Sequence, residues 1–90
     1  MYLHIGQDTV VPLKEVVGIF DMDNTTVSKH TRQFLTVAQK AGRVVTVSPE
    51  LPKSFVVCVD KDQKETVYIS QISAVTLRGR ALIKTDKRKR

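Results

Sequence analysis

The sequence predicts a small α+β domain in which a largely antiparallel sheet packs against one main amphipathic helix. Six short apolar segments, separated by turn residues, have the length and composition of β-strands. One segment, residues 28–41, instead has apolar side chains at helical spacing. The resulting order of three strands, one helix and three strands lacks the repeated crossovers that a parallel α/β sheet needs.

Three strands are expected before the helix. Residues 2–5 alternate in hydrophobicity and end at Gly6, and residues 9–11 form a second short strand. Pro12 ends this second strand because proline cannot donate to a strand ladder. Residues 16–20 are a strongly apolar third strand, and a polar loop follows it.

The helix is predicted over residues 28–41. Ser28 is a suitable N-cap residue, and Gly42 suits the position that ends a helix. The residues at i, i+3 and i+4 spacing, which place one face toward a core, are Thr31, Phe34, Leu35, Ala38 and Ala41.

Three more strands follow, at residues 43–47, 54–59 and 66–70, and Ser73 caps a short helical turn over residues 73–77. The strands at 16–20 and 54–59 are apolar at successive positions, which indicates burial on both faces of the sheet. One helix covers only one face. Either the sheet folds into a barrel or sandwich, or a second subunit covers the other face, and we favour a homo-oligomer because association enlarges a small core.

Length and composition describe one small domain. The chain has 90 residues, of which 41% are hydrophobic and 27% charged, as in ordinary globular proteins. No apolar run reaches the ~20 residues of a membrane span, and the N-terminus lacks the pattern of a signal peptide. The single cysteine, Cys58, lies in an apolar run and is expected to be buried. We expect a cytoplasmic protein with no membrane partner.

The net charge is concentrated at the C-terminus. Residues 1–77 contain eight basic and eight acidic residues, whereas residues 78–90 contain seven basic residues and one acidic residue, which accounts for the net charge of +6. A basic segment on a neutral body indicates a polyanionic partner. A solvated tail that only aids solubility is the alternative.

The segment Asp21-Met22-Asp23-Asn24-Thr25 resembles the DxDxT motif of haloacid dehalogenase-like phosphatases, in which the first Asp is a nucleophile and Mg²⁺ is bound. The chain is short for that fold and lacks its crossovers, so a phosphatase is only a remote alternative. The same segment does not fit a calcium loop, because Arg32 stands where the bidentate Glu is required. His4 and His30 are isolated, so we expect no metal site and no cofactor.

The chain resembles the RemA/RemB family of extracellular matrix regulators, and within it the RemB type most. The ordered stretches that carry this resemblance are YLHIG, VVPLK, TTVSK, TRQFL, ELPKSFV and ISAVTL, which lie between residues 2 and 77. The resemblance covers about residues 1–81 and leaves residues 82–90 as a basic tail, which we expect to be disordered. It implies a regulator of biofilm matrix genes that binds double-stranded DNA, forms closed rings and has a fold related to LytTR domains.

This chain departs from the family at the residues that the resemblance assigns to DNA. Where the RemA type carries an arginine pair before the central strand, this chain has Leu51, Pro52 and Lys53. Another DNA-contacting arginine of that type falls near Glu15, beside Lys14. Lys14 and Lys53 are therefore only local substitutes, and the helix cations Lys29, Arg32 and Lys40 can equally form a solvated face.

We therefore predict a non-enzymatic, oligomeric DNA-binding regulator with no small-molecule substrate. The alternative is a protein-interaction adaptor with a passive basic tail. The predicted DNA-binding residues are Lys14, Lys53, Arg78, Arg80, Lys84, Lys87, Arg88, Lys89 and Arg90.

Overall fold

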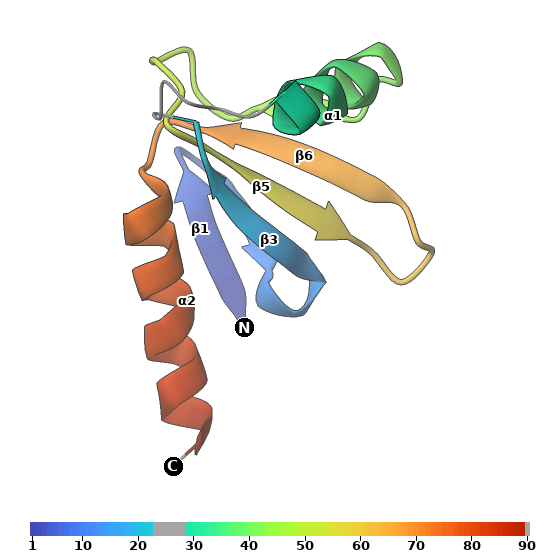
Figure 1. Ribbon diagram of the computed structural model, residues 1–90. Helices are drawn as coiled ribbons and strands as arrows, with labels where there is room; N and C mark the ends of the chain where they lie inside the picture. The colour runs from blue at the N-terminus through green and yellow to red at the C-terminus, as the bar shows by residue number, and fades with distance from the viewer. Residues whose placement is uncertain (23–28, 90) are drawn as a thin grey trace.

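The structure, a computed structural model, describes the backbone of residues 1–22 and 29–89 and the side chains of residues 1–22 and 29–82. The chain forms two small sheets and two α-helices (Figure 1). In chain order the elements are β1 (Tyr2–Gly6), β2 (Thr9–Pro12), the 3₁₀ turn η1 (Leu13–Glu15), β3 (Val16–Asp21), α1 (Lys29–Lys40), β4 (Val44–Thr46), β5 (Ser54–Val59), β6 (Glu65–Ser70) and α2 (Ala74–Lys89). The predicted α+β class and all six predicted strands are confirmed.

The larger sheet has the strand order β3-β5-β6-β4. Its first three strands pair antiparallel, whereas β4 pairs parallel to β6. The smaller sheet is the antiparallel hairpin of β1 and β2. Strand β3 is therefore an edge strand, and a register shift between Val16 and Gly18 interrupts its pairing with β5.

One face of the larger sheet is closed by the hairpin and by α2. Leu3, Val56 and Leu77 are fully buried there, and each comes from a different layer of the fold. The prediction that favoured a second subunit over a sandwich as the cover of this face is wrong, although a homo-oligomer itself stays a prediction. In the structure the chain's own hairpin covers this face, as in a sandwich.

The other face carries α1, which covers it only in part. Ala38 and Phe34 of α1 pack against Phe55 and Val67. The prediction that the third strand is buried on both faces is wrong, because Val17 is 67% exposed and Phe20 is 44% exposed. Helix α1 contacts β4, at the opposite edge of the sheet from β3, and so leaves β3 largely uncovered. The prediction holds for β5, which is buried over residues 54–58.

Helix α1 spans Lys29–Lys40, close to the predicted range, and the predicted cap Ser28 lies outside the described residues. Gly42 ends the helix as predicted. Its φ of 74° lies in the left-handed region, and its N–H donates to the Gln39 carbonyl at 3.0 Å.

The C-terminal helix is longer than the sequence predicted. Residues 73–77 were expected to form one helical turn, but α2 runs Ala74–Lys89, so the fold has two helices rather than one. Leu77 is fully buried between the two sheets, and Arg78 and Arg80 bond to carbonyls of β3 and β1, so tertiary contacts hold the helix beyond its first turn. The division into a domain over residues 1–81 and a disordered tail over residues 82–90 stays a prediction, although the backbone is helical to Lys89.

Two buried serines, one in β5 and one in β6, bond to backbone groups of β1 and of the segment before α2. Ser70 is fully buried, and its hydroxyl donates to the Ile5 carbonyl at 2.6 Å while accepting from the Ile72 N–H at 3.0 Å. The hydroxyl of Ser54, also fully buried, donates to the Ile72 carbonyl at 2.7 Å. These bonds satisfy backbone groups in the segment that leads into α2 and so fix where the helix starts.

Candidate nucleic-acid interface

Helix α2 is positioned at its start by a cap and an apolar anchor. The Ser73 hydroxyl accepts from the Thr76 N–H at 3.2 Å, which satisfies one of the free donors of the first turn. Ala74 and Leu77 face the core and are at most 2% exposed. The helix consequently lies alongside β1 and β3 (Figure 1).

Two of the predicted DNA-binding residues also hold α2 in place. Arg78 Nη2 donates to the Ile19 carbonyl of β3 at 2.8 Å, and Arg80 Nη1 donates to the His4 carbonyl of β1 at 2.9 Å. A guanidinium has five N–H donors and keeps its charge, so these bonds leave donors available for phosphate oxygens. Arg78 is exposed and Arg80 is half-buried.

The remaining cations of the C-terminus continue along the same helix. Lys84, Lys87, Arg88 and Lys89 occupy helical positions of α2, but their side chains lie outside the described part, as does the whole of Arg90. A helix of 16 residues is about 24 Å long. That length matches about seven phosphates along one strand of B-DNA. The backbone therefore places these basic residues along one helix, and their contact with DNA stays a prediction.

Lys53 and Lys14 lie at opposite ends of the β3–β5 pair. Lys53 precedes Ser54, which pairs with Asp21, whereas Lys14 lies two residues before Val16, which pairs with Cys58. Five strand residues separate the two ends, or about 17 Å. Lys53 also adjoins the start of α2, since its N–H donates to the Ser70 carbonyl at 2.8 Å. Both lysines are exposed. The structure thus places Lys53 near α2 and does not bring Lys14 and Lys53 together.

Helix α1 presents a separate set of cations. Lys29, Arg32 and Lys40 are exposed, and the first two border a shallow hollow with Thr36 and Val37. Arg43, by contrast, is occupied by an ion pair with Glu65. A solvated face and a DNA contact both stay predictions for the α1 cations.

Described acidic residues of the phosphatase-like segment and of the turn between β5 and β6 lie at a strand end and in a turn. Asp21 ends β3, and Asp23 lies outside the described residues. Asp60 accepts the N–H groups of Asp62 at 2.8 Å and Lys64 at 2.9 Å, which shapes the turn between β5 and β6. Within residues 1–22 and 29–82, no group of three His, Cys, Asp or Glu side chains is placed to hold a metal ion.

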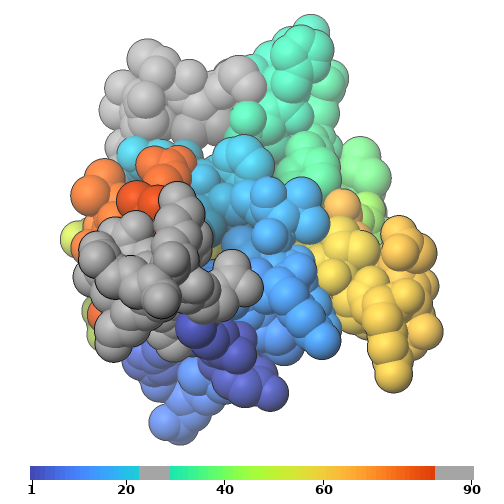
Figure 2. Space-filling view, turned by 90° about the horizontal axis from the view of Figure 1, so that it is seen from below, coloured from blue at the N-terminus to red at the C-terminus, as the bar shows by residue number. Residues whose placement is uncertain are grey.

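The view along α2 from its C-terminal end shows β3 and the turn before it at the surface, between α1 and the N-terminal hairpin (Figure 2).

Among the described residues, no helix has the length and apolar composition needed to cross a membrane.

Two comparisons identify the family. The family described as "RemA-like: Extracellular matrix regulatory protein A-like" matches residues 2–81. The chain belongs to the RemA-like family. It is similar to "Extracellular matrix regulatory protein B" of Bacillus subtilis (strain 168), with 37% identity over 81 residues, which is 90% of each chain. The resemblance to RemA and RemB is therefore confirmed, and the family is one of extracellular matrix regulation.

Sequence reasoning missed two functional features of this region. The bonds of Arg78 and Arg80 depend on which carbonyls of β3 and β1 are available to accept them. No local sequence pattern identifies those carbonyls. The exposure of Val17 and Phe20 was also missed. The sequence does show arginines that follow the buried Leu77, and it does show apolar residues on β3. Only the tertiary structure shows that the arginines bond to strand carbonyls and that β3 is an exposed sheet edge.

Proposed function

We propose that the chain is a non-enzymatic, oligomeric DNA-binding regulator of biofilm and extracellular matrix genes that acts in the cytoplasm. The observation that carries this proposal is the concentration of the net charge on one helix, beside a body whose charges balance. Contacts from such a helix to phosphates give affinity without reading base sequence. Membership of the RemA-like family supports the regulatory role, and the relation to LytTR domains is part of the same proposal.

Assembly strengthens this mode of binding. One α2 offers only a few phosphate contacts, each of modest strength. Several copies in one particle present several such helices to the same duplex, and binding of the second helix becomes intramolecular. Avidity then compensates for the missing arginine pair, where this chain has Leu51, Pro52 and Lys53.

The test compares the full chain with a variant in which Lys84, Lys87, Arg88, Lys89 and Arg90 are changed to Gln. Arg78 and Arg80 are kept because they anchor α2. Fluorescence anisotropy of a labelled duplex is measured over a range of salt concentrations. If all seven cations contact phosphates, the log–log salt slope per subunit is roughly −6, and two remaining contacts give roughly −2.

Equal slopes for the two proteins would contradict the role of α2 and move the contact to Lys14, Lys53 and the α1 cations. No binding by a folded, assembled wild type would contradict the DNA proposal itself. In that case the adaptor function takes its place, and the exposed Val17 and Phe20 favour it. Apolar partner binding depends little on salt, so the same titration distinguishes the two functions.

A further inference from the structure

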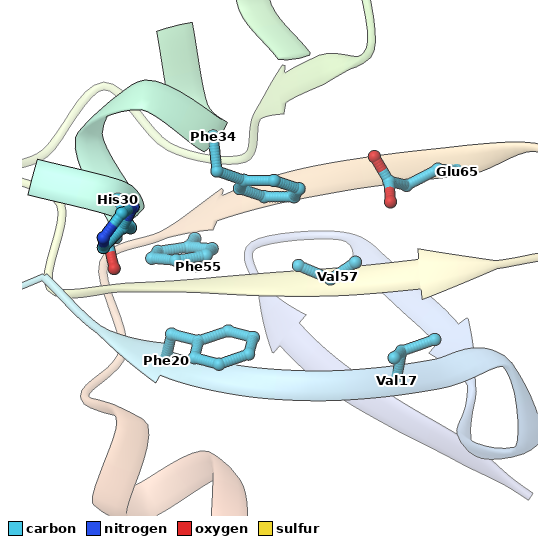
Figure 3. Close-up of a pocket in the computed structure, with 8 residues that line it drawn as sticks. Val17, Phe20, His30, Phe34, Phe55, Val57 and Glu65 are labelled. Atoms are coloured by element: carbon cyan, nitrogen blue, oxygen red, sulfur yellow. The ribbon is translucent and has the colours of Figure 1, made fainter. Parts of the chain in front are cut away.

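An apolar groove lies between α1 and the β3 edge of the larger sheet (Figure 3). It has a volume of about 380 Å³, and all three phenylalanines of the chain, Phe20, Phe34 and Phe55, line it. Their rings stack, with centroids 5.0 Å apart for Phe20 and Phe55 and 6.4 Å apart for Phe34 and Phe55. Val17 and Val57 form the other end of the groove. No described element covers β3 on this side.

The outer face of α2 carries a second exposed apolar feature. Val75 is 74% exposed and Leu82 is 65% exposed, and they lie seven residues apart, which is two helical turns. They point away from Leu77, which faces the core. Gly79 lies between them, and a Cβ at this position would meet nothing within 4 Å. Nothing within the protomer therefore requires a glycine here, where alanine is the better helix former.

We propose that the α2 stripe, defined as Val75, Gly79 and Leu82, of one copy docks into the α1–β3 groove of a second copy. This inference rests on the oligomeric part of the proposed function and names the surfaces that form the contact. An amphipathic helix in an apolar groove is a common recognition mode in proteins. Because the stripe and the groove are different surfaces, the contact is head-to-tail and leaves a free stripe and a free groove for further copies.

The spacing of the two surfaces agrees. Val75 and Leu82 are about 10 Å apart along the helix axis. The Phe20 and Val17 ends of the groove are three strand residues apart, or about 7–10 Å when the bulge is allowed for. Two apolar side chains of the helix therefore match the two ends of the groove, and Gly79 lets the backbone approach the space between them.

Ionisable residues border both ends of the groove. Glu65 borders the groove at the Val17 and Val57 end, whereas His30 borders it at the phenylalanine end (Figure 3). The C-terminal half of α2 is the strongly basic half. Because Glu65 is already paired with Arg43 within the protomer, its charge does not select a direction for the basic half of α2, and the docking rests on the apolar match alone.

The test uses one substitution on each surface, Val17→Asp in the groove and Leu82→Asp on the stripe. Both side chains are exposed in the protomer, so neither change disturbs its core. A buried, unpaired carboxylate at the contact is expected to raise the concentration needed for assembly roughly thirtyfold or more. Val37→Asp is the matched control, since Val37 is 58% exposed on α1 and lies outside the groove. Circular dichroism confirms that each variant is folded.

Light scattering then measures the mass of each variant alone and of an equimolar mixture of the two. The wild type and Val37→Asp are expected to assemble, and each groove or stripe variant alone is expected to have the protomer mass of 10.1 kDa. The mixture is expected to form a one-to-one heterodimer, because the intact stripe of Val17→Asp fits the intact groove of Leu82→Asp. No other arrangement of surfaces predicts this rescue.

The proposal is overturned if either variant alone keeps the wild-type mass, or if the mixture remains monomeric. A wild type at 10.1 kDa overturns both this proposal and the oligomeric part of the proposed function. Duplex binding measured on the same samples distinguishes failure of the docking proposal from failure of the DNA-binding function. If the variants behave as expected but the wild type binds no duplex, the contact stands and the DNA function fails. If the wild type binds duplex but the masses do not change, only the choice of surfaces fails.

Discussion

The two faces of the four-stranded sheet are covered to different extents. On one face the hairpin and α2 bury Leu3, Val56 and Leu77 completely. On the other face α1 leaves Val17 and Phe20 substantially exposed. A chain of this size buries only part of its apolar surface, so it closes one core well and leaves the second core incomplete. The closed face therefore stabilises the protomer, while the open face is available for association.

The largest expected effect contrasts two neighbouring residues of α2. Leu77→Ala is expected to lower the free energy of unfolding by about 2–5 kcal/mol, because it leaves a cavity in the closed core. Val75→Ala, on the exposed side of the helix, is expected to change it by about 0.5 kcal/mol or less. Urea denaturation at one protein concentration measures both. Similar losses for the two variants would contradict the assignment of the two sides of α2.

The next effect concerns the hydrogen bonds of the closed face. Ser70→Ala removes a hydroxyl that donates to Ile5 and accepts from Ile72. The expected loss of unfolding free energy is about 1–3 kcal/mol, because buried backbone groups are left without partners. Ser73→Ala is the comparison, since it removes only a helix cap and is expected to cost about 1 kcal/mol. Thermal unfolding of the two variants should rank them in this order, and the reverse order would contradict the structural role of Ser70.

A pH effect tests the burial of Cys58 on the closed face. Burial, with a smaller contribution from the negative charge of Glu15, raises the pKa of the Cys58 thiol from 9.0 to about 11. The neutral thiol is favoured in the folded state, so its contribution is fully present below pH 9 and is lost as pH rises from 9 toward 11. The expected loss is about 2 kcal/mol.

Denaturant unfolding between pH 8 and pH 11 measures this effect as the difference between the wild type and Cys58→Ala. The variant keeps every other titrating group, so the difference reports the thiol together with its effect on Tyr68, whose pKa is raised by burial and by the charge of Cys58. The same pH dependence in both proteins would show that Cys58 does not contribute. Slow alkylation of the native thiol is the expected companion result, because Cys58 is only 4% exposed.

The smallest expected effect has the opposite sign. Gly79→Ala is expected to raise the stability of the protomer by about 1 kcal/mol, because Gly79 lies in a helix and space is open around its Cβ position. The same change is expected to weaken assembly if the docked helix needs a close approach at Gly79. Thermal unfolding of a monomeric Val17→Asp background, with and without Gly79→Ala, isolates the first effect. A loss of stability there would contradict the open surroundings of Gly79.

Most of the fold could be predicted because its elements have regular periods. The six strands and α1 follow from alternation, helical spacing and the residues that end each element, such as Pro12 and Gly42. The length of α2 could not be predicted, because its hydrophobic pattern is weak and charged residues follow Leu77. Only the tertiary contact of Leu77 with both sheets shows that the first turn continues as a helix.

The candidate site could be predicted in composition but not in geometry. Charge counting located the basic residues on the segment after Leu77. It could not show that Arg78 and Arg80 are also bonded to the carbonyls of Ile19 and His4. The groove at Val17 was missed for a related reason, since successive apolar residues in a strand indicate two apolar faces but not what covers each face.

We infer that association covers the open face and leaves the closed face unchanged. The most direct measurement compares methyl NMR spectra of the wild type with those of Leu82→Asp. Shifts are expected at the groove methyls of Val17 and Val57, and none at the methyls of Val11 and Val56 in the closed core. Unchanged groove methyls, or equal shifts on both faces, would contradict it.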